Sequence, residues 1–418
     1  MHCAILYRIT TMNQASSTDI ESNQKTNFIA FGDITGLLQV LDLPTIDSKK
    51  DPIPQKKEDS IIQQKKATFQ GLAFHKLPIN KVKWNPNFEK IATVDDGNSL
   101  VVWNKNDDLY SSQMVNNRGI STIMDVRWSK NGRDISFLYE DGHIFSGTVE
   151  GKNTWYNNLE EETKFIEYSP NDDKILVSQK KEKIFVLSSS GQQIGEITLN
   201  ESIKNLEIAN INWWGRNNSK YIENEGFYKK HLMIAFKNGT VILIDDETDE
   251  DPVVIKTELK KITKTQWEVD GLYIAILGEL TDDKIIKEEQ EEDEKDKKDE
   301  NNIDENNNKN NNTNNNKENG INTNGNNKDN KDMETSTYNN NINNNKKYNN
   351  NIPYNGQNKS ILLFYNVKGE LIKKFICPCH VNSFSWGYSS TLALAADKYI
   401  YLAFAKFNYK WTYFNNNK

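Results

Sequence analysis

Cysteine is scarce in this sequence: the 418 residues contain three, Cys3, Cys377 and Cys379. Three cysteines cannot form a disulfide framework in a chain of this length, so we expect a reducing compartment. No run of roughly 18 consecutive apolar residues exists, which excludes a membrane-spanning helix. Residues 1–12 lack the apolar core of a secretory signal. These absences indicate a soluble, intracellular protein.

The sequence also has little that carries known chemistry. It has no phosphate-binding loop, no dinucleotide-binding glycine motif, no His-Glu-x-x-His pair and no nucleophile elbow, and it contains five histidines. The tightly spaced Cys377-Pro-Cys379-His380 is a poor match to a zinc knuckle, so we expect packing there. A net charge of −7 provides no basic field for nucleic acid. We therefore expect no cofactor, no metal, no nucleic acid and no small-molecule substrate.

Hydrophobic residues make up only 36% of the chain, and the mean hydropathy is −0.78. Two polar inserts account for this dilution. Residues 45–66 form a short insert, while residues 281–358 begin as a Glu/Lys/Asp run and become almost pure asparagine. Such a segment buries too little apolar surface to fold, so we predict that it is disordered. A prion-like role for the asparagine tract is the alternative that we consider weaker.

Short strand patterns recur along the rest of the chain. In residues 82–103 a first strand ends in Trp84, a second follows at 90–93, and a third at 100–103 ends in Trp103. The aromatic residue that ends the first strand recurs at spacings of 44, 40, 45, 54 and 119 residues. These anchors are Trp84, Trp128, Tyr168, Trp213, Trp267 and Trp386. Propeller blades of four strands repeat at roughly 40 to 45 residues, and the two longer spacings contain inserts.

The repeat predicts an all-β fold, a seven-bladed WD-repeat β-propeller with a long disordered Asn-rich insert. Six copies follow the anchors, and strands at 28–31 and 37–41 belong to a seventh. The corresponding division begins with an N-terminal segment at 1–27 that contains a candidate closing strand. Blades 1 to 5 and the first part of blade 6 occupy 28–280, the insert occupies 281–358, and the end of blade 6 and all of blade 7 occupy 359–414. A β-sandwich is the weaker alternative, because its strands need no constant period.

Several finer expectations follow from this pattern. Residues 12–25 are too polar to show the first strand of the first blade. Asp-Gly and Asn-Gly pairs predict two-residue hairpin turns with positive φ at both positions. Trp103 is expected at the same blade position as the anchors, and Trp214 on the opposite strand face or in the adjoining loop. The segments that we identify as the first strands of the blades contain one acidic residue. This argues against a catalytic propeller with carboxylates in its channel.

Longer stretches of the chain resemble one family of propellers. These are Gly36–Leu41, Met114–Arg118, Tyr139–Gly142, Gly147–Gly151 with Trp155, Asp251–Ile255 and Asn408–Trp411. In this order they resemble the first propeller of a WD-repeat subunit family of intraflagellar transport complex A. In that family a second propeller and a helical-repeat tail follow, so the resemblance implies that Lys418 falls at the junction with the second propeller.

The resemblance implies a non-catalytic scaffold that supports retrograde ciliary transport, cilium assembly and the entry of membrane-protein cargo. Its partners would be the other complex A subunits, with membrane-protein cargo and tubby-like adaptors. Its location would be the cilium, the ciliary basal body, and the cytoplasm or cytoskeleton. The matches suggest protein contacts at Asn116, Asn117 and Arg118 and at Tyr409, Lys410 and Trp411; a self-satisfied turn and a closing strand are the competing interpretations. The alternative function is a WD-repeat adaptor of a vesicle coat or a ubiquitin-ligase substrate receptor.

Overall fold

The computed structural model describes residues 2–10, 16–22, 28–42, 68–214, 231–280 and 360–406, apart from short gaps. These gaps are 88, 107–108, 117–119, 151, 180–182, 200–202, 204, 215–230, 246–248, 250, 270, 378 and 388–390. Both expected inserts, 45–66 and 281–358, lie outside the described residues. No helix among the described residues has the length and hydrophobicity to span a membrane.

The described elements are β-strands arranged in seven four-stranded antiparallel sheets. The first three blades are β2 (Ser17–Ser22), β3 (Phe28–Asp33), β4 (Leu37–Asp42) and β5 (Thr68–Ala73); β6 (Ile79–Trp84), β7 (Lys90–Asp95), β8 (Leu100–Asn106) and β9 (Leu109–Asn116); and β10 (Ile123–Trp128), β11 (Asp134–Tyr139), β12 (His143–Thr148) and β13 (Asn153–Asn158). The next three are β14 (Thr163–Tyr168), β15 (Lys174–Gln179), β16 (Lys183–Ser188) and β17 (Gln193–Thr198); β18 (Ile208–Trp213), β19 (Leu232–Phe236), β20 (Thr240–Ile244) and β21 (Val253–Lys256); and β22 (Lys261–Trp267), β23 (Tyr273–Glu279), β24 (Ser360–Asn366) and β25 (Leu371–Ile376). The seventh is β26 (Ser383–Trp386), β27 (Thr391–Ala396), β28 (Tyr399–Lys406) and β1 (His2–Thr10).

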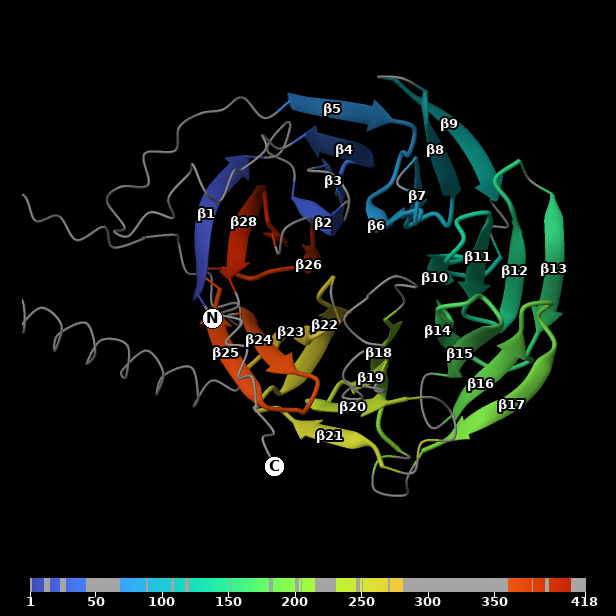
Figure 1. Ribbon diagram of the computed structural model, residues 1–418. Coiled ribbons are helices and arrows are strands. Elements are labelled where there is room, and N and C mark those ends of the chain that lie inside the picture. The colour runs from blue at the N-terminus through green and yellow to red at the C-terminus, as the bar shows by residue number, and fades with distance from the viewer. Residues whose placement is uncertain are drawn as a thin grey trace, which may run out of the picture. The chain divides into compact units, whose positions relative to one another are not determined.

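The blades form a closed ring, which confirms the predicted seven-bladed β-propeller (Figure 1). Each innermost strand contacts the innermost strand of the next blade, and β26 contacts β2 to complete the circle. The seventh blade takes its outermost strand from the other end of the chain: β1 pairs antiparallel with β28, with His2 opposite Lys406 and Thr10 opposite Tyr399. Closure of this kind joins the two ends of the fold and removes the gap between the first and last blades.

The innermost strand of the first blade is β2, which the polar sequence of residues 12–25 did not reveal. Its burial alternates, with Ile20 fully buried and Asp19 and Glu21 partly exposed. Ser22 stands where the other blades carry an aromatic anchor. It lies against Gly387: a Cβ added at Gly387 would come within 3.1 Å of the Ser22 Cβ, so the two segments approach closely here. The repeat was identified by the aromatic residue that ends each first strand. Because serine occupies this position in β2, the strand could not be identified in that way.

The prediction of two-residue hairpin turns with positive φ at both positions is wrong. Gly142 and Gly239 have φ values of 88° and 92°, whereas Asp141 and Asn238 do not adopt positive φ. The turns are instead three-residue loops closed by a hydrogen bond, such as that from Gly142 N to Tyr139 O at 3.1 Å. One left-handed residue after an ordinary turn is sufficient in such loops. In the turn at 95–98 the left-handed residue is Asn98, with φ 65°.

Trp103 does not share the position of the anchors, contrary to expectation. It lies on β8, and its indole Nε1 donates to Thr93 Oγ1 at 2.9 Å. His75 Nε2 lies 2.7 Å from the same hydroxyl, and His75 Nδ1 lies 2.8 Å from Asp95 Oδ2. With Nδ1 protonated, His75 donates to Asp95 and accepts the Thr93 hydroxyl proton. This chain of hydrogen bonds fastens the loop that joins β5 to β6 onto the second blade.

We expect Thr93→Val to lower the free energy of unfolding by about 2–4 kcal/mol. The substitution keeps the shape of the side chain but leaves the Trp103 N–H and a His75 ring nitrogen without their buried partner, at about 1–3 kcal/mol each. Chemical denaturation followed by tryptophan fluorescence measures the change. Thr154→Val, on the exposed face of β13, is the matched control and should change stability by less than about 0.5 kcal/mol. Equal effects of the two variants would contradict the buried network.

Stability should also fall as the pH drops below about 6.5, the usual histidine value. Burial lowers the pKa of His75 and outweighs Asp95, and burial likewise lowers the pKa of His231. Because the unfolded state then binds these protons more readily than the folded state, acidification favours unfolding. Urea denaturation at pH 7.5 and 5.5 measures the difference in the free energy of unfolding between the two pH values. This difference should become smaller in His75→Gln and smaller again when His231→Gln is added. An unchanged difference would show that these histidines do not cause the loss of stability.

Candidate functional site: the charged central channel

The innermost strands enclose a central channel with a volume of about 620 Å³. Side chains project into it at two levels, because alternate residues of a strand face the same side. Ring A comprises the third residue before each anchor position: Asp19, Lys81, Asp125, Phe165, Asn210, Lys264 and Ser383. Ring B comprises the residue directly before each anchor position: Glu21, Lys83, Arg127, Glu167, Asn212, Gln266 and Ser385. The seven blades thus present charged and polar groups from residues far apart in sequence.

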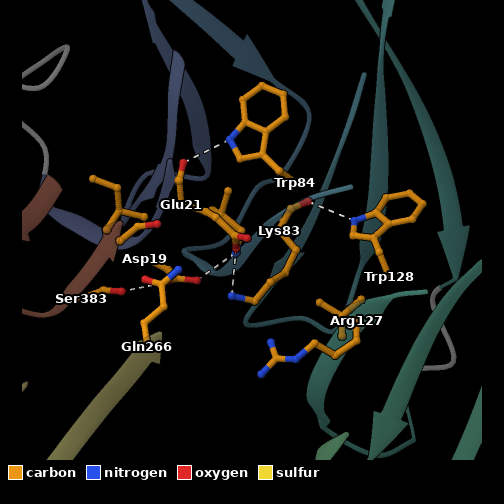
Figure 2. Close-up of polar contacts among 12 residues, drawn as sticks. Asp19, Glu21, Lys83, Trp84, Arg127, Trp128, Gln266 and Ser383 are labelled. Carbon is orange, nitrogen blue, oxygen red and sulfur yellow. Dashed lines mark hydrogen bonds and ion pairs between the residues drawn. The ribbon is translucent and has the colours of Figure 1, made fainter. Parts of the chain in front are cut away.

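Three of the anchor tryptophans join their blade to the one before it. The Nε1 groups of Trp84, Trp128 and Trp267 donate to the backbone carbonyls of ring B residues on the preceding blade, Glu21, Lys83 and Asn212. Each of these bonds is 3.1 Å long, and the first two are drawn in Figure 2. The indoles are at most 5% exposed. Each of these three anchors therefore combines apolar packing with a hydrogen bond between blades.

Asp19 of ring A connects four blades. Its carboxylate accepts hydrogen bonds from Val82 N on β6 at 3.0 Å and from Ser383 Oγ on β26 at 2.6 Å. Lys264 Nζ on β22 lies 3.2 Å from the same carboxylate, and the bond to Ser383 is visible in Figure 2. Burial works to raise the pKa of Asp19, but Lys264, Lys83 and the two hydrogen bonds outweigh it and hold the pKa well below its usual range. Asp19 is therefore ionised in the folded protein.

Ring B carries a second network of ion pairs. Lys83 Nζ lies 3.0 Å from Glu21 on the preceding blade, and Arg127 Nε lies 3.1 Å from Glu167 on the following blade. Lys130, just beyond β10, reaches the same Glu167 at 2.6 Å. Burial alone would lower the pKa of Lys83, but Glu21 and Asp19 raise it. These pairs link the first two blades and the third to the fourth.

The channel contains more carboxylates than the sequence indicated. Rings A and B include four, Asp19, Glu21, Asp125 and Glu167, where the recognised strand segments gave one. The expectation failed because β2 was not recognised and because β10 begins at Ile123, three residues before the segment that was read. No group of three or more metal-ligating side chains occurs among the described residues.

The other singled-out residues lie outside rings A and B or outside the described residues, although Trp214 also lines the channel. Asn116 ends β9 opposite Leu100, whereas Asn117, Arg118 and residues 409–411 lie outside the described residues. Cys377 is fully buried in the core between the sixth and seventh blades. Trp214 lies just after β18, stacks on His231 with ring centres 5.7 Å apart, and donates to Val269 O at 3.3 Å. This places Trp214 in the adjoining loop, one of its two expected positions.

The fold and channel define a class of protein, the seven-bladed β-propeller built from WD-type repeats. A family model described as WDR35/TULP4 N-terminal matches residues 1–300. The chain belongs to this family of N-terminal β-propellers.

Two kinds of curated relative support this membership. The chain is 28% identical over 291 residues to WD repeat-containing protein 35 of Mus musculus, which covers 67% of this chain and 23% of the mouse protein. It is 26% identical over 280 residues to the Homo sapiens protein of that name, with 65% and 22% covered. Tubby-related protein 4 of Homo sapiens is 25% identical over 250 residues, with 52% and 16% covered. The chain thus matches less than a quarter of the length of these relatives.

Proposed function

We propose that this propeller is a non-catalytic, protein-binding module of intraflagellar transport complex A, acting in retrograde transport, cilium assembly and the entry of membrane-protein cargo. The observation that carries the proposal is the family match over residues 1–300, together with the likeness to WD repeat-containing protein 35. Its partners in this proposal are the other complex A subunits, membrane-protein cargo and tubby-like adaptors. Its locations are the cilium, the basal body and the surrounding cytoplasm or cytoskeleton.

The state of the channel carboxylates supports a scaffold rather than an enzyme. General acid–base catalysis is most efficient when the pKa of the group lies near the working pH. Asp19 is held ionised by Lys264 and two hydrogen bonds, and Glu167 contacts both Arg127 and Lys130. These carboxylates join blades to one another. They make the ring a rigid platform on which the inter-blade loops present contact residues.

Affinity purification of the endogenously tagged protein from ciliated cells, read by mass spectrometry, tests this proposal. Recovery of the other complex A subunits, together with short or absent cilia on depletion, is the expected result. A preparation rich in vesicle-coat or ubiquitin-ligase subunits, without ciliary transport proteins, would replace the proposal with the adaptor alternative.

The contact residues inferred from the sequence are tested in the same assay. We propose that Arg118 contributes to partner binding together with Asn116 and Asn117, and that Tyr409, Lys410 and Trp411 form a second contact. Arg118→Ala should reduce subunit recovery by several-fold, about 1 kcal/mol for a typical contact residue. Arg133→Ala, at an exposed position beyond β10, is the matched control and should leave recovery unchanged. Equal recovery with both variants would exclude Arg118.

A further inference from the structure

One cation of the central channel has no ion-pair partner among the described residues. Lys83, Arg127, Lys130 and Lys264 each lie within 3.2 Å of a carboxylate oxygen. Lys81 of ring A lines the same channel, yet neither a hydrogen bond nor an ion pair joins its ammonium group to a described side chain. Lys81 is partly buried, and an ammonium group that loses water without gaining a partner is disfavoured, so this position is unusual.

The two carboxylates that act on Lys81 electrostatically are already occupied. Asp19 and Asp125 lie on the blades before and after Lys81, and both act on it electrostatically. Asp19 is held by Val82, Ser383 and Lys264. Asp125 accepts from Val126 N at 2.9 Å and Ile166 N at 3.2 Å, and lies 3.4 Å from Arg127. Neither carboxylate is positioned to take Lys81 as a contact partner.

Rings A and B carry four cations and four carboxylates, so the channel is distinguished by Lys81, which is unpaired among the described residues, and not by an excess of positive charge. Lys130, which lines the channel outside the two rings, adds a fifth cation. A further carboxylate of the wall, Glu268, follows the anchor Trp267 and is only 1% exposed, so it lies behind the channel surface. Burial lowers the pKa of Lys81 and outweighs Asp125 and Asp19. An anion beside Lys81 would oppose that effect.

The channel is also large enough and polar enough for a ligand. Its volume of about 620 Å³ lies within the range of small-molecule sites, roughly 300–1,000 Å³. Gln266 of ring B also lines it, and its Oε1 accepts a hydrogen bond from the Trp386 backbone N–H at 3.0 Å, a bond that does not use the two amide N–H groups of Gln266. An ammonium group and nearby amide donors are the groups that bind phosphate oxygens in proteins.

We propose that the central channel is a binding site for a small, soluble, phosphate-bearing anion, with the Lys81 ammonium as its principal contact. The site lies inside the ring, so it is separate from the loops that present protein contacts and stands independently of the proposed function. Bound anion would join rings A and B and thereby stabilise the closed propeller.

Isothermal titration calorimetry of the full chain with sodium pyrophosphate, against sodium chloride of equal ionic strength, tests this site. Saturable binding in the micromolar to millimolar range, roughly 4–8 kcal/mol, is expected for pyrophosphate alone. Lys81→Met should weaken it by about tenfold or more, whereas Lys256→Met, at an exposed position on β21, should not. Heat that chloride reproduces, or binding that Lys81→Met leaves unchanged, would overturn the proposal.

A second measurement on the unmodified protein covers the case in which Lys81→Met does not fold. Acetic anhydride labelling, read by mass spectrometry of peptides, reports the accessibility of each lysine. Pyrophosphate should slow the labelling of Lys81 several-fold and leave that of Lys256 unchanged. Equal rates at Lys81 with and without pyrophosphate would exclude the site.

Discussion

Replacing Asp19 with alanine is expected to lower the free energy of unfolding by about 2–4 kcal/mol, less than for a fully buried ion pair because Asp19 and Lys264 are partly exposed. The change leaves Lys264 without its carboxylate, and removes the acceptor of Val82 N and the Ser383 hydroxyl. These groups come from three blades, so the loss affects the closure of the ring rather than one sheet. Urea denaturation followed by circular dichroism measures the change.

The matched control for Asp19 is Asp42→Ala, which removes an exposed aspartate at the end of β4. Its effect should stay within about 0.5 kcal/mol. A pH series adds an independent readout. The folded-state pKa of Asp19 is depressed, so its stabilisation is complete above about pH 4 and is lost as the pH falls further. Asp19→Ala should therefore flatten the acid limb of the stability curve, and an unchanged limb would show that Asp19 is not the group responsible.

Replacing Trp128 with alanine is the second change with a large expected effect, about 3–5 kcal/mol, as for other buried aromatic side chains. Trp128 is 5% exposed and packs in the core between the second and third blades. Its indole N–H also donates to Lys83 O on the preceding blade. The substitution removes both the packing and the bond, and thermal unfolding followed by circular dichroism would record a lower Tm.

Trp128→Phe separates the two contributions. Phenylalanine keeps most of the apolar packing but cannot donate to the Lys83 carbonyl, so we expect a smaller loss of about 1–3 kcal/mol. Trp155→Ala provides a comparison at an outer strand, where the side chain is only partly buried and packs against Gly191. If Trp155→Ala were as damaging as Trp128→Ala, the inner anchors would have no special part in joining blades.

Local patterns were sufficient for the architecture but not for all of its elements. The anchors Trp84, Trp128 and Trp386 each end an innermost strand, as their spacing predicted. Strand β2 was missed because Ser22 replaces the aromatic, although Ile20 between Asp19 and Glu21 retains the alternation of a half-buried strand. The His75–Thr93–Trp103 network was missed because its members, 18 and 10 positions apart, lie on a loop and two strands that become neighbours only when the blade folds.

The sequence by itself determined the seven-fold repeat of this protein, because strand alternation and anchor spacing depend on residues close together in the chain. The tertiary structure alone decided which charges meet in the channel. Lys264 contacts Asp19 across 245 positions, and β1 pairs with β28 across nearly the whole chain. No local pattern encodes such partners, because they become neighbours only when the ring of blades closes. The same closure leaves Lys81 between two carboxylates that other groups have already taken.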